Sequence, residues 1–407
     1  MTLPDFQYAP LDLASDGIRL VRLMRGGWPD PIHCEILETY LRDIDYIPYE
    51  ALSYCWGSNE KTSSIIMDNC HKPVTDNLFA ALNRLRSQHL DRILWIDAIC
   101  IDQDNKKEQG HQVAKMKRIY ENAERVIAWL GDDGDDVERK METDALMRIM
   151  AVLRDPDHKR TRMKFALQEG KTPKDRLHLM WPCVQARMGV DEYDDEICTG
   201  LARTLNTLLC RPWFRRTWII QEVACARSLL IMCGSYEISS RVFVDFASLL
   251  GVPFDHQSQA NALLDIMPGR RRKESWWNES RDLQTLLVKF QASEATDERD
   301  KVYALLGISS DASLRNAFPP DYEKPMHKVM QNTISFVLFR RLVDLDAYPL
   351  PVLEMPDIHW RQANNCAIVS LRAYEGEEFR QPRPQSQQRQ RGPTLPTAVC
   401  QLESTWT

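Results

Sequence analysis

The sequence predicts an α/β protein with a doubly wound, mainly parallel sheet, an added β-hairpin and a mainly helical C-terminal region. Three apolar runs, YEALSYCWG, ILWIDAIC and RVIAWLG, alternate with two helical segments, which is the β-α-β-α-β order of such sheets. The second run is apolar on both faces, as expected of a strand covered by helices on each side. Ligands bind beyond the carboxyl ends of strands in these sheets, so the three endings should gather at one rim.

A β-hairpin is expected before the three runs. Residues 18–24 (IRLVRLM) and 32–41 (IHCEILETYL) partly alternate between apolar and polar side chains on either side of the turn GGWPDP. We expect this hairpin at an edge of the sheet.

Helices are expected between the strand-like runs. Leucines recur at helical spacing through DNLFAALNRLRSQHL, behind Asp76 as the candidate N-cap. A second helix has a start like a capping box at Asn105 and Glu108, and it leads the chain into RVIAWLG.

The composition divides the chain into four regions. Residues 1–48 form the hairpin extension and residues 49–223 the main domain, within which the charged, weakly periodic segment 154–198 is expected to be a mobile insertion. Residues 224–345 form a mainly helical companion region. Residues 346–407 include RQPRPQSQQRQRGPTLPT, so we expect this tail to be disordered and dispensable for folding.

Charge and cysteine usage exclude several classes of protein. Lys and Arg number 52 against 58 Asp and Glu, and the net charge of -6 gives no general reason to bind nucleic acid or anionic lipid. The odd count of 11 cysteines without a CxxC pair indicates reduced thiols. Neither a signal peptide nor an apolar run of membrane-spanning length is found, and His and Cys never cluster at zinc spacings. We expect a cytoplasmic protein without a membrane span, metal or cofactor.

Six stretches carry a resemblance to a known family. They are YEALSYCWG, VTDNLFAALNRLR, LWIDAICIDQ, QVAKMKRIYENAERVIAWLG, RPWFRRTWIIQE and ATDERDKVYALLGI. In this order and spacing they resemble the fungal heterokaryon incompatibility (HET) domain proteins. The match covers residues 49–223 as the domain proper and about 18–330 with its usual companions.

The resemblance implies a function and a fold. HET domains act as effectors of fungal non-self recognition, which trigger regulated cell death when incompatible hyphae fuse. The implied fold is flavodoxin-like and related to TIR domains. Because some TIR domains cleave NAD+, the resemblance also implies NAD+ glycohydrolase activity, with NAD+ as a substrate rather than a cofactor. This chain departs from the family at Asp102, where Asn is common, and in its short tail after ALLGI.

Trp56, Gly57 and Ser58 end the first run and are candidate ligand-binding residues. Trp56 could stack on an adenine or nicotinamide ring while Gly57 lets the backbone approach a phosphate. Alternatively, Trp56 is a core aromatic and Gly57 only permits the turn.

Asp97 and Glu222 are the candidate catalytic residues. Asp97 lies within an apolar strand, where an unpaired carboxylate is costly, so it stabilises positive charge on a ribose or accepts backbone N–H groups. Glu222 is a functional carboxylate supported by Arg215, or it forms an ion pair with Arg215 or Arg216. Asp102 and Gln103 are further ligand-binding candidates; Asp102 positions a ligand or caps the next helix.

Two functions of different classes agree with these residues. The first is an enzyme that hydrolyses NAD+ or a related nucleotide. The second is a non-catalytic signalling module that self-associates or docks onto an incompatibility partner protein. An inactive, truncated copy of the family is a further alternative. A carboxylate and an aromatic side chain that converge on one pocket would favour the enzyme.

Overall fold

The structure is a computed structural model, and the chain divides into two compact units, Met1–Asp344 and Leu345–Thr407. The residues it describes are 3–41, 47–57, 60–132, 136–152, 170–189, 193–251, 259–312, 318–342, 371–374 and 399–402. In the second unit, β10 (Leu371–Tyr374) and β11 (Val399–Leu402) form an antiparallel pair. The predicted disorder of the rest of this tail lies outside the described residues.

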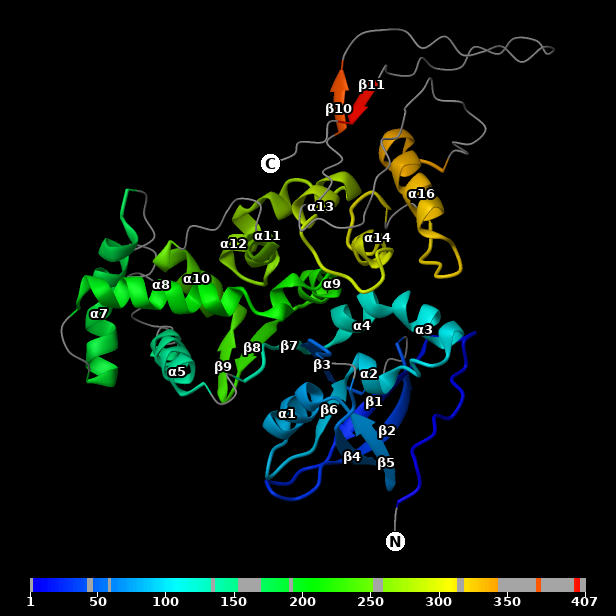
Figure 1. Ribbon diagram of the computed structural model, residues 1–407, viewed down its shortest axis with the longest axis horizontal. Coiled ribbons are helices and arrows are strands. Elements are labelled where there is room, and N and C mark those ends of the chain that lie inside the picture. Colours follow the sequence, from blue (N-terminus) through cyan, green and yellow to red (C-terminus); the bar gives the residue numbers. More distant parts are fainter. Residues whose placement is uncertain are drawn as a thin grey trace. The chain divides into compact units, whose positions relative to one another are not determined.

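The first unit is built on a nine-stranded mixed sheet in the order β5-β4-β2-β1-β6-β3-β7-β8-β9 (Figure 1). The strands are β1 (Gly17–Leu23), β2 (His33–Tyr40), β3 (Glu50–Tyr54), β4 (Ser63–Met67), β5 (Cys70–Val74), β6 (Arg92–Trp95), β7 (Arg125–Trp129), β8 (Leu229–Cys233) and β9 (Tyr236–Ser239). The adjacent strands β6, β3, β7 and β8 are parallel, and among the other pairs only β2 with β4 is parallel. The α/β class is confirmed, whereas the sheet is mixed rather than mainly parallel.

The predicted hairpin is present, but it does not lie at an edge of the sheet. Strands β1 and β2 pair from Gly17 with Tyr40 to Leu23 with Cys34, and β1 also pairs antiparallel with β6. Six of the seven residues of β1 are buried, which is typical of a strand covered on both faces rather than of an edge. The edges are β5 and β9 instead.

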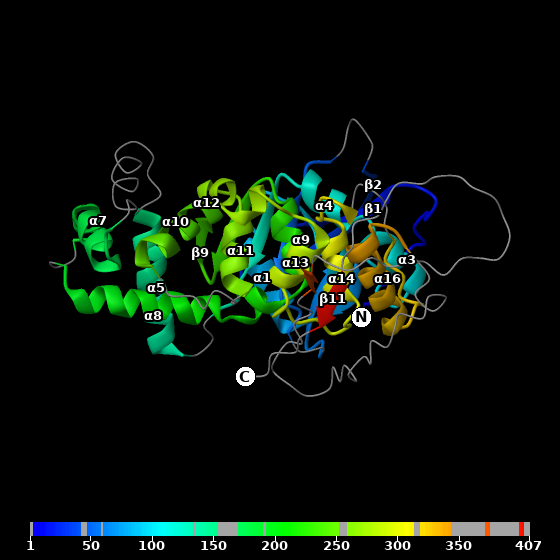
Figure 2. The ribbon, with the colours of Figure 1, turned by 90° about the horizontal axis from the view of Figure 1, so that it is seen from above.

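Helices surround this sheet. They are α1 (Asp76–Leu85), α2 (Asp97–Cys100), α3 (Lys106–Val113), α4 (Met116–Asn122), α5 (Val137–Val152), α7 (Pro173–Met188), α8 (Asp195–Leu209), α9 (Trp218–Cys225), α10 (Ser240–Leu250), α11 (Gln259–Ile266), α12 (Arg270–Glu274), α13 (Leu283–Lys289), α14 (Asp300–Leu306) and α16 (Met326–Phe339), with 3₁₀ turns η1 (Pro212–Arg215) and η2 (Trp276–Asn278). Helix α9 packs on α4, α11 and α14, and α5 and α10 contact β9 (Figures 1 and 2). No helix of the described ranges is long and apolar enough to cross a membrane.

The two predicted helices start close to where the sequence analysis expects, and the N-cap of the first lies one residue earlier. Thr75, not Asp76, caps α1, because its side chain accepts from the Leu78 N–H. Asn105 caps α3 by accepting from the Glu108 N–H at 3.2 Å. The Glu108 side chain does not complete a capping box; it forms a buried ion pair with Arg19 of β1 at 2.5 Å.

Part of the segment 154–198, which the sequence analysis expects to be a mobile insertion, forms the helix α7. Helix α7 starts with a capping box between Thr172 and Asp175. It buries four apolar side chains at helical spacing, which are Leu177, Met180, Trp181 and Val184. The stripe is hidden in the sequence because charged residues surround it. Residues 153–169 lie outside the described part of the chain.

Candidate functional site

The carboxyl ends of β3 and β7 meet at Asn77, in the first turn of α1. Asn77 Nδ2 donates to the Cys55 carbonyl at 2.6 Å, and its Oδ1 accepts from Trp129 Nε1 at 2.9 Å. Both strand ends turn through glycine, since φ is 74° at Gly57 and 89° at Gly131, where other residues are strained. Two of the three endings therefore meet as expected, held by a residue that the sequence analysis missed; its only signal is its place one residue after Asp76.

Trp56 links the end of β3 to the residues that follow β6. Its Nε1 donates to Asp97 Oδ2 at 2.9 Å, and Asp97 Oδ1 accepts from the Ala98 N–H at 2.7 Å. The expectation that Asp97 lies inside a strand is wrong. Strand β6 ends at Trp95, and Asp97 opens the short helix α2 because the Ile101 N–H returns to the Asp97 carbonyl. The third ending thus joins the rim through a hydrogen bond between two predicted site residues.

Gln103 and Asp102 are neighbours in the loop after α2, but they form hydrogen bonds with different parts of the chain. Gln103 Nε2 donates to the Asp97 carbonyl at 2.9 Å, so it supports the backbone at Asp97. The Asp102 N–H donates to Glu108 Oε1 at 2.8 Å, and Asp102 Oδ1 accepts from the Asp104 N–H at 3.2 Å. Asp102 therefore shapes the turn before α3 and does not cap that helix.

Glu222 in α9 is buried, with 2% of its surface exposed. Burial raises its pKa to about 7, while the charge of Arg216 and side-chain hydrogen bonds with Ser53 and Tyr120 oppose that rise. Its Oε2 has no hydrogen-bond partner among the described residues. Glu222 is therefore a carboxyl group that changes charge near neutral pH.

Arg216 provides the positive charge that Asp97 and Glu222 share. Burial raises the pKa of Asp97 as well, and Arg216 lowers it together with the Trp56 indole and a backbone N–H. Arg216 Nη1 donates to the Tyr54 carbonyl at the end of β3. Its neighbour in sequence turns away, since Arg215 pairs with Glu294 at 3.3 Å on the surface. Of the two arginines left open by the sequence, Arg216 is thus the one that faces both carboxylates.

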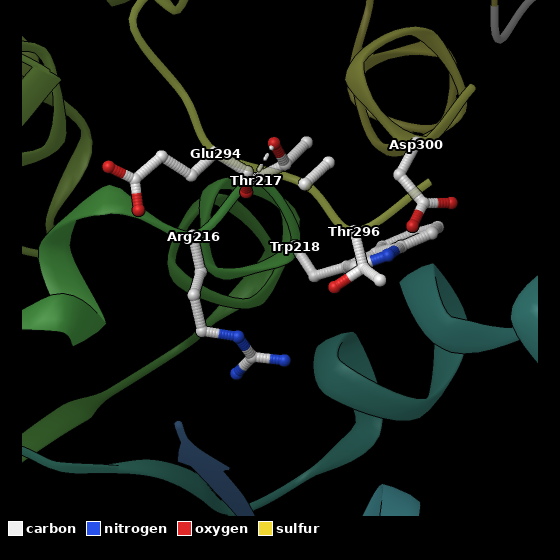
Figure 3. A pocket seen from close by; sticks show the side chains of 7 residues that line it. Arg216, Thr217, Trp218, Glu294, Thr296 and Asp300 are labelled. Atoms are coloured by element: carbon white, nitrogen blue, oxygen red, sulfur yellow. Dashed lines mark hydrogen bonds between the residues drawn. The ribbon is translucent and has the colours of Figure 1, made fainter. Parts of the chain in front are cut away.

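Two hollows flank the cluster formed by Trp56, Asp97, Arg216 and Glu222. The first, of about 260 Å³, is lined by Trp56, Gly57, Glu60, Thr62, Thr75, Asp76 and Asn77. The second, of about 350 Å³, is lined by Arg216, Thr217, Trp218, Glu294, Ala295, Thr296 and Asp300. In Figure 3 the Arg216 guanidinium points away from Glu294 and Asp300, which lie on the other side of the second hollow. Ser58 lies outside the described residues.

The arrangement suits reactions in which positive charge develops on a substrate. Trp56 lines the first hollow, and its Nε1 donates a hydrogen bond to Asp97. A fixed negative charge on Asp97 would stabilise a cation bound in this hollow. Glu222 can hold or release a proton near neutral pH. The described residues contain no group of three His, Cys, Asp or Glu side chains that could hold a metal ion.

Comparisons with known proteins identify the domain that carries this cluster. Residues 49–222 match the family described as heterokaryon incompatibility protein (HET). Heterokaryon incompatibility protein 6, OR allele, from Neurospora crassa is 28% identical over 355 residues, which cover 78% of this chain and 51% of that protein. The chain thus spans about half the length of this relative. No solved structure matches the chain. All four residues of the cluster, Trp56, Asp97, Arg216 and Glu222, lie within the family match, so the cluster belongs to the part of the chain that is similar to HET domains.

Proposed function

We propose that this protein acts in fungal heterokaryon incompatibility as an effector that triggers regulated cell death by hydrolysing NAD+. The role in incompatibility rests on the HET domain and on the Neurospora relative. The chemistry rests on one observation: Asp97, which is hydrogen-bonded to Trp56 of the first hollow, and Glu222 both face Arg216.

The first hollow suits the nicotinamide end of NAD+. Trp56 offers an aromatic face, and Glu60 and Asp76 add negative charge to the lining. A cationic aromatic ring is attracted by both features. Nicotinamide in NAD+ is such a ring, and it becomes neutral when its bond to the ribose breaks.

Each carboxylate then has a role in the cleavage. As the N-glycosidic bond breaks, its electron pair leaves with nicotinamide and positive charge develops on the ribose, which ionised Asp97 stabilises. Water adds to the ribose carbon and loses a proton, for which we assign Glu222 as the acceptor, since its pKa of about 7 matches neutral pH. The products are nicotinamide, ADP-ribose and a proton. Burial raises the pKa of Asp97, and the charge of Arg216 opposes that rise and so favours the ionised form.

The fold supports the same proposal. The four adjacent parallel strands β6, β3, β7 and β8, with the cluster beyond the carboxyl ends of β3 and β6, support the proposal of a flavodoxin-like, TIR-related core. We infer that the antiparallel strands on either side are additions to such a core.

The test is nicotinamide release from NAD+ by the purified full chain. We expect Asp97→Asn to lower the rate by roughly a hundredfold, because the neutral amide keeps the shape but not the charge, while the free energy of unfolding changes by about 1 kcal/mol. Asp104→Asn is the matched control, because Asp104 is an exposed carboxylate of the next loop, and it should retain full activity.

A specific observation favours a second function. The hydrogen bonds of Asp97 to Trp56 and Ala98 are also those of a structural acceptor, so the cluster could stabilise the rim of a signalling module that docks onto a partner protein. In that case the chain would release no nicotinamide even when assembled. Expression of folded Asp97→Asn in a fungal host would then stop growth as the parent chain does.

A further inference from the structure

Arg216 lies on a short stretch that has no regular secondary structure of its own. The 3₁₀ turn η1 ends at Arg215, and α9 begins at Trp218. A distant part of the chain holds the two residues between them. Glu294 forms an isolated parallel β-bridge with Arg216, in which the Glu294 N–H donates to the Arg215 carbonyl at 2.7 Å and the Thr217 N–H donates to the Glu294 carbonyl at 2.9 Å.

Side chains reinforce this bridge from both sides. Thr217 is buried, and its Oγ1 donates to the Glu294 carbonyl at 3.1 Å. Gln259 Nε2 donates to the Arg216 carbonyl at 3.3 Å. The ion pair between Arg215 and Glu294 is half exposed on each side, so it contributes little. The backbone bridge, the Thr217 hydroxyl and Gln259 therefore hold the backbone of Arg216 in place, from which its side chain reaches the Tyr54 carbonyl.

The segment 294–300 is itself anchored to the rest of the companion region. The Asp300 carboxylate accepts from the Tyr322 hydroxyl at 2.6 Å and hydrogen-bonds with Trp218, the first residue of α9. Directly after α14, Gly307 lies so close to α9 that a Cβ there would be 2.4 Å from Gln221 Nε2. Figure 3 shows the resulting arrangement, with Glu294 beside Thr217 and Asp300 beside Trp218.

We propose that the segment 294–300, through its backbone bridge to Arg216 and Thr217, is the positioning element that keeps the charge of Arg216 near Asp97 and Glu222. This segment lies outside the residues that match the HET family, so the functional unit of the chain extends beyond the domain. The inference concerns the site of the proposed function, but its test requires no substrate.

The charge state of Glu222 reports the position of Arg216. The groups that act on Glu222 are Arg216, Asp97 from α2, Ser53 from β3 and Tyr120 from α4, and Arg216 is the cation among them. If Arg216 moves away, the favourable charge interaction weakens while burial remains, so the pKa of Glu222 rises above about 7.

The experiment measures the unfolding free energy of the full chain between pH 4 and 9. Each variant is made with and without Glu222→Gln, and the difference between the two curves isolates the titration of Glu222. Thr217→Val removes the hydroxyl at nearly constant shape, and Gln259→Leu removes the other donor. We expect each to raise the upper midpoint of this titration, by up to about one pH unit.

Two matched variants serve as controls. Thr217→Ser keeps the hydroxyl, and Glu294→Gln removes only the surface ion pair, so both should leave the midpoint near pH 7. The proposal is overturned if Thr217→Val and Gln259→Leu lower stability equally at all pH values without moving the midpoint. It is also overturned if Glu294→Gln moves the midpoint as far as they do. A chain that releases no nicotinamide would contradict the proposed function and leave this measurement valid.

Discussion

At the scale of single residues, the chemistry of the candidate site depends on two buried or half-buried carboxylates around one guanidinium. Asp97 has hydrogen-bond donors on both oxygens, whereas Glu222 has one oxygen without a partner among the described residues. Burial is the main cause of the raised pKa of Glu222, which reaches about 7 despite the nearby Arg216. A buried carboxyl with this pKa makes stability depend on pH in a predictable direction.

Glu222 should make the native protein lose stability as pH rises from about 4.5 to about 7. In this window the folded chain holds a proton on Glu222 that the unfolded chain has released, so raising the pH favours unfolding. The total loss due to this residue is about 3 kcal/mol, because one pKa unit corresponds to about 1.4 kcal/mol.

Denaturant unfolding of the full chain at several pH values measures this loss. Glu222→Gln should show a smaller decline over the same window, and the remaining decline reflects the raised pKa of Asp97. Parallel curves for the parent chain and Glu222→Gln would show that Glu222 has an ordinary pKa and would remove it as a proton acceptor.

At the scale of elements, the rim exists because short polar contacts join strand ends that are distant in sequence. Asn77 of α1 joins β3 to β7, and Trp56 joins β3 to α2. On the other side of α2, the buried pair of Arg19 and Glu108 joins β1 to α3. Arg19 also donates to the Cys100 carbonyl at the end of α2, at 3.2 Å, so this pair supports the helix that carries Asp97.

Removing one member of this buried pair should be strongly destabilising. Glu108→Gln leaves the Arg19 guanidinium buried without its counter-charge, which costs about 3–5 kcal/mol in comparable pairs. The double variant Arg19→Met with Glu108→Leu removes both charges and should recover about half of the loss or more. Denaturant unfolding measures both values. A loss below about 1 kcal/mol for Glu108→Gln would mean that water reaches the pair.

At the scale of the whole molecule, the family match is smaller than the unit that folds. Residues 49–222 exclude β1, which lies between β2 and β6, and β8, which pairs with β7. They also exclude the segment 294–300 that holds Arg216. The sheet and the site therefore both depend on residues on either side of the domain.

Two truncations follow from this organisation. A fragment of residues 49–222 should lack a cooperative unfolding transition, because it lacks β1, which pairs with β6, and β8, which pairs with β7. Removal of residues 345–407 should leave the unfolding free energy of Met1–Asp344 within about 0.5 kcal/mol of the parent value, since the two form separate units. Calorimetry checks both, and a cooperative transition in the short fragment would refute the larger unit.

Sequence periodicity was sufficient for much of the local structure. It predicted the hairpin, the strands β3 and β7, the helix starts near Thr75 and at Asn105, and a rim where the strands end. It failed for α7, where charged residues surround the apolar stripe, and at Asp97, where an apolar run continues from a strand into a helix. Periodicity describes which face of an element is apolar, but it does not describe where an element stops when apolar residues continue.

The sequence by itself determined the α/β class and the HET resemblance, and it named Asp97 and Glu222 as catalytic candidates, because these depend on residue types and on their order. Only the tertiary structure decided that β1 enters the middle of the sheet, that Arg216 rather than Arg215 faces Glu222, and that Glu294 holds Arg216. Each of these depends on a contact between segments far apart in the chain. Such contacts are selected by packing and by hydrogen-bond register in three dimensions, which local sequence patterns do not specify.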